Sequence, residues 1–204
     1  MVNYLIVLFA LTLVYFASTE RIVNYIRLIG IQGLLLCGIA LFELNEVNVL
    51  NLTLIAAETL LVKTLLMPYL LYRIVGNSGV TKVHRLAMPA FYTLLFSIFA
   101  LLISVILAES MVNSFVSIVF MTTALFTIFV GLLLIITHRL IISHIIGFMV
   151  IENAVFLFSI AAGNRMPVLI NVGILLDIFA GVLILGFFGL RLKSHANELT
   201  KLKD

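Results

Sequence analysis

Long apolar stretches separated by short polar segments make up nearly the whole chain of 204 residues. A helix that spans a membrane needs about 20 mostly apolar residues, and seven stretches have roughly this length, the first being the shortest. They cover residues 3–18, 22–42, 49–72, 86–108, 111–137, 140–162 and 167–190. The pattern therefore predicts an all-α integral membrane protein, built as a bundle of about seven transmembrane helices.

The composition agrees with a chain surrounded by lipid. Hydrophobic residues make up 64% and charged residues 10%, and the mean hydropathy is +1.30. A soluble domain is typically about 45–50% apolar and about 25% charged, so soluble and disordered chains are excluded. The single Cys37 lies in an apolar stretch, which excludes an internal disulfide and a cysteine metal site. The small basic excess lies in loops and tail, which indicates membrane orientation and not nucleic-acid binding.

The positive charges lie mostly on one side of the predicted bundle. Ten of the twelve Lys and Arg residues fall in alternate loops and in the tail, whereas Arg165 is alone on the other side and Lys63 lies within a span. The positive-inside rule then places the N-terminus outside and the C-terminus in the cytoplasm. No Lys or Arg precedes the first stretch, so we expect a retained helix and no signal peptide. We expect a multi-pass protein of the cytoplasmic (inner) membrane.

One longer loop divides the chain. Residues 1–72 form a three-helix segment, 73–85 a cytoplasmic loop rich in turn residues, 86–190 a four-helix segment, and 191–204 a basic cytoplasmic tail. Seven spans do not divide into two equal inverted halves, which argues against the usual architecture of secondary transporters.

Four ionisable residues fall inside predicted spans. Each costs roughly 2.5–3.5 kcal/mol at the bilayer centre, so each needs a reason to be there. They are Glu58 and Lys63 in the third span, Glu152 in the sixth and Asp177 in the seventh. At a rise of about 1.5 Å per residue, each lies roughly 14 to 18 Å from an end of its span. Charges at similar depth on three helices are suited to lateral transfer of a proton or another charge.

Two interpretations of these charges stay open. Lys63 could neutralise Asp177 or Glu152 and simply hold helices together. However, three acids against one base leave a carboxyl without a cationic partner, and such a group can bind and release a proton. We therefore expect a proton path that includes these four residues.

The third and sixth predicted spans carry further candidate residues for the proton path. Glu58 and Lys63 are five residues apart, about 140° around an α-helix, so we do not expect them to pair within the helix. Pro68 removes the hydrogen bond to the Thr64 carbonyl and predicts a kink. His144, near the cytoplasmic end of the sixth span, could relay protons from Glu152, or could simply face the headgroups. We expect His138 and His84 to be interfacial loop residues.

No motif for bond-making chemistry is present. The chain has no Gly-rich phosphate loop, no Ser/His/Asp set, no cysteine cluster and no pair of histidines with haem-ligand spacing within a span. We therefore expect no cofactor, no metal site and no catalysis by this chain alone.

From residue 135 onward the sequence resembles subunit K of respiratory complex I and the C subunit of multisubunit cation/proton antiporters. The matching features are His138-Arg139, Gly147, Glu152-Asn153 and Asp177 followed by Gly181. One position departs from that family, because its glutamate corresponds to Met149 and here Glu152 stands about one turn later. With ENAVFLF, LLDIFAGV and the closing LTKLKD, and with Lys63 five residues before Pro68, the chain resembles component E of the membrane-bound group 4 hydrogenases, of the hydrogenase-4 or formate hydrogenlyase type. This resemblance is strong over about the last third of the chain and moderate in the third span, and the first, second and fourth spans share only the hydrophobic pattern.

The resemblance implies a non-redox membrane-arm subunit of a hydrogenase complex. It would contribute to a proton or Na⁺ path. It would also anchor antiporter-like partners, and a partner similar to the H component of complex I, to the hydrogenase module. The nickel-iron and iron-sulfur centres would lie in partner subunits. Two alternatives remain, namely an independent transporter of a small solute or ion, and a structural spacer whose charges only lock helices.

Overall fold

The computed structural model describes residues 1–19, 21–43, 49–78, 89–111, 117–138 and 141–161, together with Phe179, Gly181 and Gly186. These residues form helices and no strands. In chain order the elements are α1 (Val2–Ser18), α2 (Ile22–Glu43), α3 (Val49–Glu58), a π-helix η1 (Thr59–Leu66), α4 (Met67–Ser78), α5 (Ala90–Met111), α6 (Ile118–Thr137) and α7 (Ile141–Ala161). The predicted seventh span lies outside the described residues except for those three positions.

The chain is a multi-pass membrane protein by the length and polarity of its helices. Five are long and apolar enough to cross a membrane: Ile22–Glu43, Ile55–Gly76, Phe91–Met111, Ile118–Thr137 and Ile142–Ala161. The helix α1 is shorter, with 17 residues, and at about 1.5 Å per residue it measures roughly 25 Å. The expected all-helical membrane fold is therefore confirmed, and the five long helices and α1 correspond to the first six predicted stretches.

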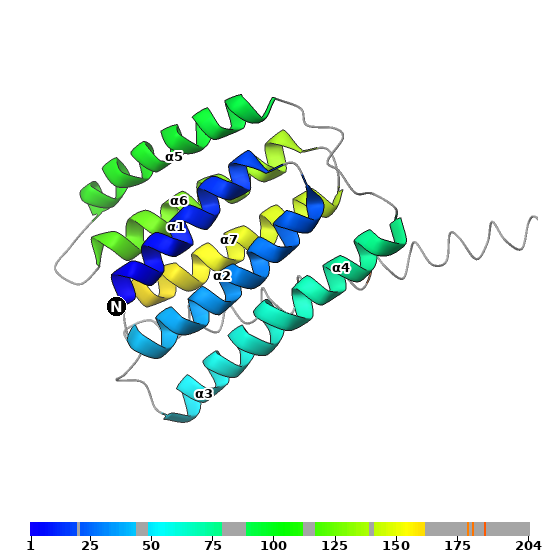
Figure 1. The fold of residues 1–204 in the computed structure, drawn as a ribbon. Coiled ribbons are helices and arrows are strands. Elements are labelled where there is room, and N and C mark those ends of the chain that lie inside the picture. Colours follow the sequence, from blue (N-terminus) through cyan, green and yellow to red (C-terminus); the bar gives the residue numbers. More distant parts are fainter. Residues whose placement is uncertain are drawn as a thin grey trace, which may run out of the picture.

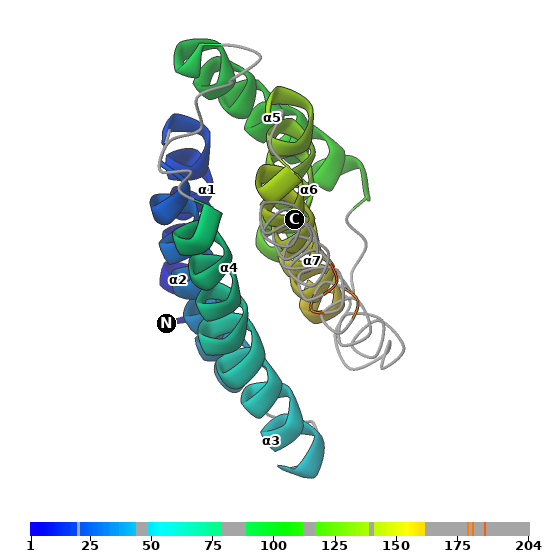
Figure 2. The same cartoon turned by 90° about the vertical axis from the view of Figure 1, so that its right-hand side faces the viewer.

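The helices run alternately up and down, in two layers (Figures 1 and 2). One layer holds α1, α2 and the continuous α3–η1–α4 rod, and the other holds α6 and α7, with contacts of α1 on α6 and of α2 on α7 joining them. The helix α5 lies across one edge of both layers and contacts α1 and α6. The α1–α2 and α6–α7 turns lie at the same end of the bundle, on the right in Figure 1. We call this the arginine-rich end, because Arg21, Arg27 and Arg73 lie near it.

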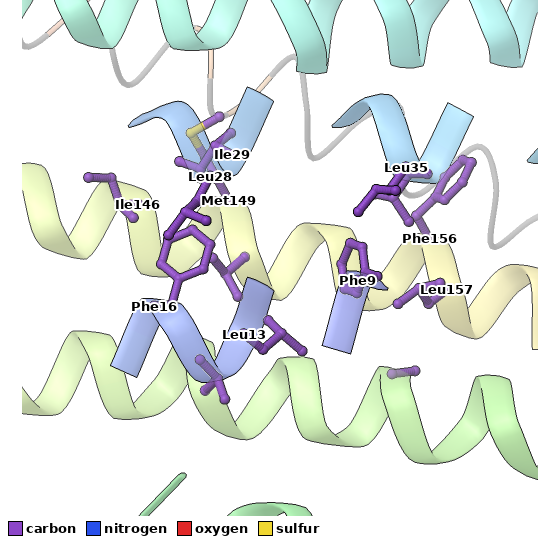
Figure 3. Close-up of a cluster of buried hydrophobic side chains, with 14 of the residues drawn as sticks. Phe9, Leu13, Phe16, Leu28, Ile29, Leu35, Ile146, Met149, Phe156 and Leu157 are labelled. Atoms are coloured by element: carbon purple, nitrogen blue, oxygen red, sulfur yellow. The ribbon is translucent and has the colours of Figure 1, made fainter. Parts of the chain in front are cut away.

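The core lies between α1, α2 and α7 and falls into two groups of apolar side chains (Figure 3). Both groups are almost completely buried. The first group contains Phe16, Leu28, Ile29, Ile146 and Met149, and the second contains Phe9, Leu35, Phe156 and Leu157. Polar residues between these sequence positions, such as Gln32 and Asn153, therefore lie between two apolar layers.

The outer helix α5 turns its small residues inward. Thr93, Ser97 and Ser104 are buried, whereas Phe99 and Ile106 are 62% and 67% exposed. Large apolar side chains face outward because the surroundings of a membrane helix are themselves apolar, and small residues let neighbouring backbones approach closely.

Close backbone approach is most evident where α6 crosses α7. A Cβ atom added at Gly131 would lie 2.9 Å from the carbonyl oxygen of Gly147, and one added at Gly147 would lie 2.9 Å from that of Gly131. Such contacts need a backbone shift, so this crossing is built on two glycines.

We predict that Gly131→Ala lowers the free energy of unfolding by about 1–3 kcal/mol, because the new methyl overlaps backbone atoms of α7. The matched control is Gly76→Ala, where nothing lies within 4 Å and where alanine should stabilise the helix by about 0.5–1 kcal/mol. Unfolding in detergent micelles, titrated with SDS, measures both. Equal effects of the two changes would contradict the close crossing.

Candidate functional site

The buried face of the α3–η1–α4 rod repeats every four residues. Along it the buried positions are Ile55, Thr59, Lys63, Met67, Leu71 and Val75. In an α-helix a step of four residues overshoots one turn by about 40°, so such a stripe drifts around the rod. The wider turn of the π-helix compensates for this drift. As a result Lys63, at the centre of η1, faces the same neighbours as the apolar residues on either side of it.

Local hydrogen bonds follow the wider π pattern. The Met67 amide donates to the Val62 carbonyl, and the Thr64 hydroxyl donates to the Thr59 carbonyl at 3.1 Å, each spanning five residues. Pro68 has no amide hydrogen to donate to the Thr64 carbonyl. The structure places a π-helical segment directly before the proline, and the rod continues through it (Figure 1).

The π segment lies directly against two glycines of α2. A Cβ atom added at Gly33 would lie 2.8 Å from the Thr64 hydroxyl oxygen and 3.0 Å from the Lys63 carbonyl carbon. A Cβ atom at Gly30 would lie 3.5 Å from the Thr64 carbonyl oxygen. The glycines thus give α2 a flat surface, and the backbone of η1 approaches closely enough for Lys63 to extend past α2 toward α7.

Lys63 meets Glu152 of α7 in the interior. The Nζ atom lies 3.7 Å from Oε1, and the two side chains are 4% and 2% exposed. This distance is within the range of an ion pair but longer than a direct hydrogen bond. The Lys63 ammonium also lies 5.4 Å from the ring centroid of Phe156, one turn further along α7, where the ring face attracts a cation. The sequence left Asp177 and Glu152 open as partners of Lys63. Glu152 lies within ion-pair distance of the lysine, and Asp177 lies outside the described residues.

Next to Glu152, a chain of amide hydrogen bonds crosses the bundle. Asn153 of α7 donates to the Gln32 side-chain oxygen at 3.0 Å, and Gln32 of α2 donates to the Thr12 hydroxyl of α1 at 2.9 Å. Thr12 in turn donates to the Phe9 carbonyl at 2.7 Å. Gln32 is fully buried, and buried amides are costly without such partners.

We call Thr12, Gln32, Lys63, Glu152 and Asn153 the mid-membrane polar layer. Each member lies near the middle of its helix, and together they connect α1, α2, α7 and η1. Sequence reasoning missed Thr12 and Gln32. For Gln32 the signal was present, because an amide at the centre of an apolar stretch needs a hydrogen-bonding partner on another helix.

The other predicted site residues are Glu58, His144 and Asp177. Glu58 is half-buried at the end of α3. Its expected separation of 140° from Lys63 is wrong, because the π-helix between them links residues five apart and brings such positions closer to one face. His144 is half-buried near the start of α7, roughly 12 Å along the helix from Glu152. Asp177 lies outside the described residues.

Two further expectations concern neighbouring positions. Gly181, which follows Asp177 by one turn, faces Met67, since a Cβ atom there would lie 3.3 Å from the Met67 methyl. His138 is not interfacial as expected. It is 2% exposed, and its ring contacts the side chain of Tyr25, because the α1–α2 turn covers the end of α6. His84 lies outside the described residues.

No group of three or more His, Cys, Asp or Glu residues that could hold a metal ion occurs among the described residues. The expectation that redox centres lie in partner subunits stays a prediction. Comparisons with protein-family models, with curated proteins and with solved structures give no match for this chain.

We predict that Lys63→Met and Glu152→Gln each destabilise the protein by about 3–5 kcal/mol, because each leaves a buried charge without its partner. The double variant removes both charges and should be destabilised by clearly less than the sum of the single changes. SDS titration in micelles measures all three variants. As a control, Lys63→Met combined with Glu43→Gln should be additive, since Glu43 is exposed at the end of α2. Additive effects of Lys63→Met and Glu152→Gln would contradict the ion pair.

Proposed function

We propose that this chain is a non-redox membrane subunit that carries protons sideways through the helix bundle, along the mid-membrane polar layer. The observation that carries the proposal is the buried ion pair between Lys63 of η1 and Glu152 of α7. Charged residues within membrane helices are expensive and are typically kept for ion or proton pathways. The rod that holds Lys63 is moreover irregular at that point, and π segments occur frequently at functional sites.

The chemistry requires only that one carboxyl change its protonation state. The Glu152 carboxylate accepts a proton and becomes neutral, while the Lys63 ammonium keeps its charge above the ring of Phe156. When Glu152 passes the proton on, the ion pair forms again. Asn153 and Gln32 hold the adjacent turn of α7 through their hydrogen bond. Glu58 and Asp177 are the proposed acids on either side of this pair, and His144 is the proposed link toward the arginine-rich end.

The apolar groups above and below the layer favour lateral transfer. Phe16, Ile29 and Met149 lie on one side, and Phe9 and Leu35 lie on the other (Figure 3). A proton moving straight through the bundle would have to cross side chains that offer no hydrogen-bonding groups. A proton moving within the layer meets polar groups on four helices, α1, α2, η1 and α7.

A subunit that moves charge sideways needs partners on both sides. The segments that resemble component E of group 4 hydrogenases support a place in a formate hydrogenlyase-like or complex I-like complex, in the cytoplasmic membrane. There the chain would lie between antiporter-like proteins and a protein similar to the H component of complex I. Running the proton-uptake assay below with and without sodium decides whether the ion is H⁺ or Na⁺.

The proposed topology has seven spans, with the N-terminus outside and the tail in the cytoplasm. It rests on the alternating turns of the described helices and on Arg21, Arg27 and Arg73 near one end. We predict that alkaline phosphatase fused after residue 204 is inactive and that a fluorescent protein fused there is bright, because the former matures only outside the cytoplasm. An active phosphatase fusion would contradict the orientation.

We predict that Glu152→Gln reduces redox-linked proton uptake at least about tenfold, because a carboxamide cannot bind a proton. Asp177→Asn should act in the same direction and at least as strongly, and Lys63→Arg should retain part of the activity, because it keeps the charge in a bulkier side chain. The complex is purified through a tag on this chain and reconstituted in liposomes. Proton uptake and electron transfer between soluble dyes are measured on the same sample.

Electron transfer should persist in all three variants, because the proposal places the redox centres in partner subunits. Glu43→Gln, at the exposed end of α2, is the matched control and should leave proton uptake unchanged. Undiminished uptake in the Asp177→Asn, Glu152→Gln double variant would favour the structural spacer. Proton uptake by the purified chain alone would favour the independent transporter.

A further inference from the structure

A second buried polar cluster lies at the arginine-rich end, outside the polar layer. His138, directly after α6, is 2% exposed and lies in contact with Tyr25 of α2. Their rings meet edge to face, with centroids 5.7 Å apart and an interplanar angle of 88°. Tyr25 also contacts the Thr19 carbonyl at the end of α1. The cluster therefore fastens the α1–α2 turn to the end of α6.

The hydrogen on the Nδ1 atom of His138 follows from its neighbours. Nδ1 lies 3.0 Å from the Leu134 carbonyl oxygen, which can only accept, and 2.9 Å from the Thr137 hydroxyl oxygen. The Thr137 hydroxyl donates its own hydrogen to the Leu133 carbonyl at 2.6 Å, so toward His138 it also accepts. Both neighbours of Nδ1 are acceptors, and Nδ1 therefore carries a hydrogen in the neutral and in the charged ring.

When the ring is neutral, Nε2 of His138 competes with the Thr19 carbonyl for the hydrogen of the Tyr25 hydroxyl. Nε2 lies 3.1 Å from the Tyr25 hydroxyl oxygen, and that hydroxyl lies 2.7 Å from the Thr19 carbonyl oxygen. With a neutral ring, both Nε2 and the carbonyl are acceptors, and the hydroxyl has one hydrogen to give. With a protonated ring, Nε2–H donates to the Tyr25 oxygen while the Tyr25 hydroxyl donates to Thr19. The same atom positions then satisfy every group.

We propose that His138 is a proton-binding site, and that binding of a proton at Nε2 fixes the Tyr25 hydroxyl on the Thr19 carbonyl. This goes beyond lateral transfer in the polar layer and does not depend on it. The step adds one proton to Nε2 and turns one O–H bond, and it breaks no covalent bond.

The surroundings of the site set the pH at which it responds. Burial lowers the pKa of His138 below its ordinary value of 6.5, the hydrogen bond to Leu134 raises it, and the nearby charge of His144 on α7 lowers it. Besides His144, the titratable group facing the ring from the described helices is Tyr25 of α2, whereas Arg21 and Arg27 are exposed. The site therefore binds its proton at a lower pH than an ordinary histidine does.

The lowered pKa of His138 determines how the stability of the folded protein changes with pH. Because the folded protein binds the proton less readily than the unfolded chain, the unfolded state holds more protons as the pH falls below about 6.5. The contribution of His138 to stability is therefore fully present above that pH and decreases as the pH falls through the lowered pKa.

Nitrogen NMR of the full chain with ¹⁵N-labelled histidine, in lipid nanodiscs, tests the proposal. The chain has four histidines, and single His→Gln variants assign them. At about pH 8 the neutral ring of His138 should be the Nδ1–H form, and its titration midpoint should lie below 6.5. Tyr25→Phe should lower this midpoint further, by about one pH unit, because the charged ring loses its acceptor.

Tyr15→Phe is the matched control, because Tyr15 is 50% exposed on α1, and it should leave the midpoint unchanged. The form of the neutral ring is read in the parent protein, so the test stands even if Tyr25→Phe fails to fold. A neutral ring of the Nε2–H form would overturn the proposal. An equal midpoint in the parent and in Tyr25→Phe would also overturn it. Neither readout depends on proton transport by the chain.

Discussion

Burial of the charges on Lys63 and Glu152 is the constraint on which the rest of the bundle depends. Moving a charged group from water to an apolar interior is penalised by several kcal/mol even after relaxation, and only a partner in good geometry offsets this. The structure supplies that partner across two helices, at 3.7 Å. The flat surface of α2 at Gly30 and Gly33 and the wide turn of η1 are both explained by the need to bring Lys63 to this place.

The ion pair of Lys63 and Glu152 is surrounded by uncharged groups that hold it in place. Phe156 offers its ring to the ammonium, and Asn153 is fixed through Gln32 to α1. Such an arrangement keeps a favourable position for Lys63 whether Glu152 is ionised or neutral. A purely structural ion pair has no need of the aromatic ring, and this is the physical reason for preferring a site whose protonation changes over a fixed helix clamp.

The apolar pattern predicted most of the fold, because the hydrocarbon interior leaves helices as the natural solution for long apolar stretches. The apolar pattern could not predict features that depend on contacts between helices. The span at residues 49–72 was predicted as a kinked helix, but the direction of Lys63 depends on the π-helical turn before Pro68, and this turn is stabilised by its contact with α2. The pairing of Lys63 with Glu152 likewise depends on three-dimensional packing.

The contacts of His138 and Gln32 could not be predicted from the sequence. His138 was assigned to the interface as a loop residue, but it is buried and contacts Tyr25, 113 residues away. Gln32 was visible as a polar residue among apolar ones. Its partners lie on two other helices, and a single sequence does not reveal which ones.

The most direct test of the account is whether Glu152 exchanges a proton inside the membrane. Infrared difference spectra of the purified chain in lipid, recorded between neutral and acidic pH, report the carbonyl stretch of a protonated carboxylic acid. The account predicts such a band, its loss in Glu152→Gln, and its persistence in Glu43→Gln. If Glu152 contributed no protonated-acid band at any pH at which the protein remains folded, the carboxylate would be a fixed member of the ion pair, and the proposed proton path would be contradicted.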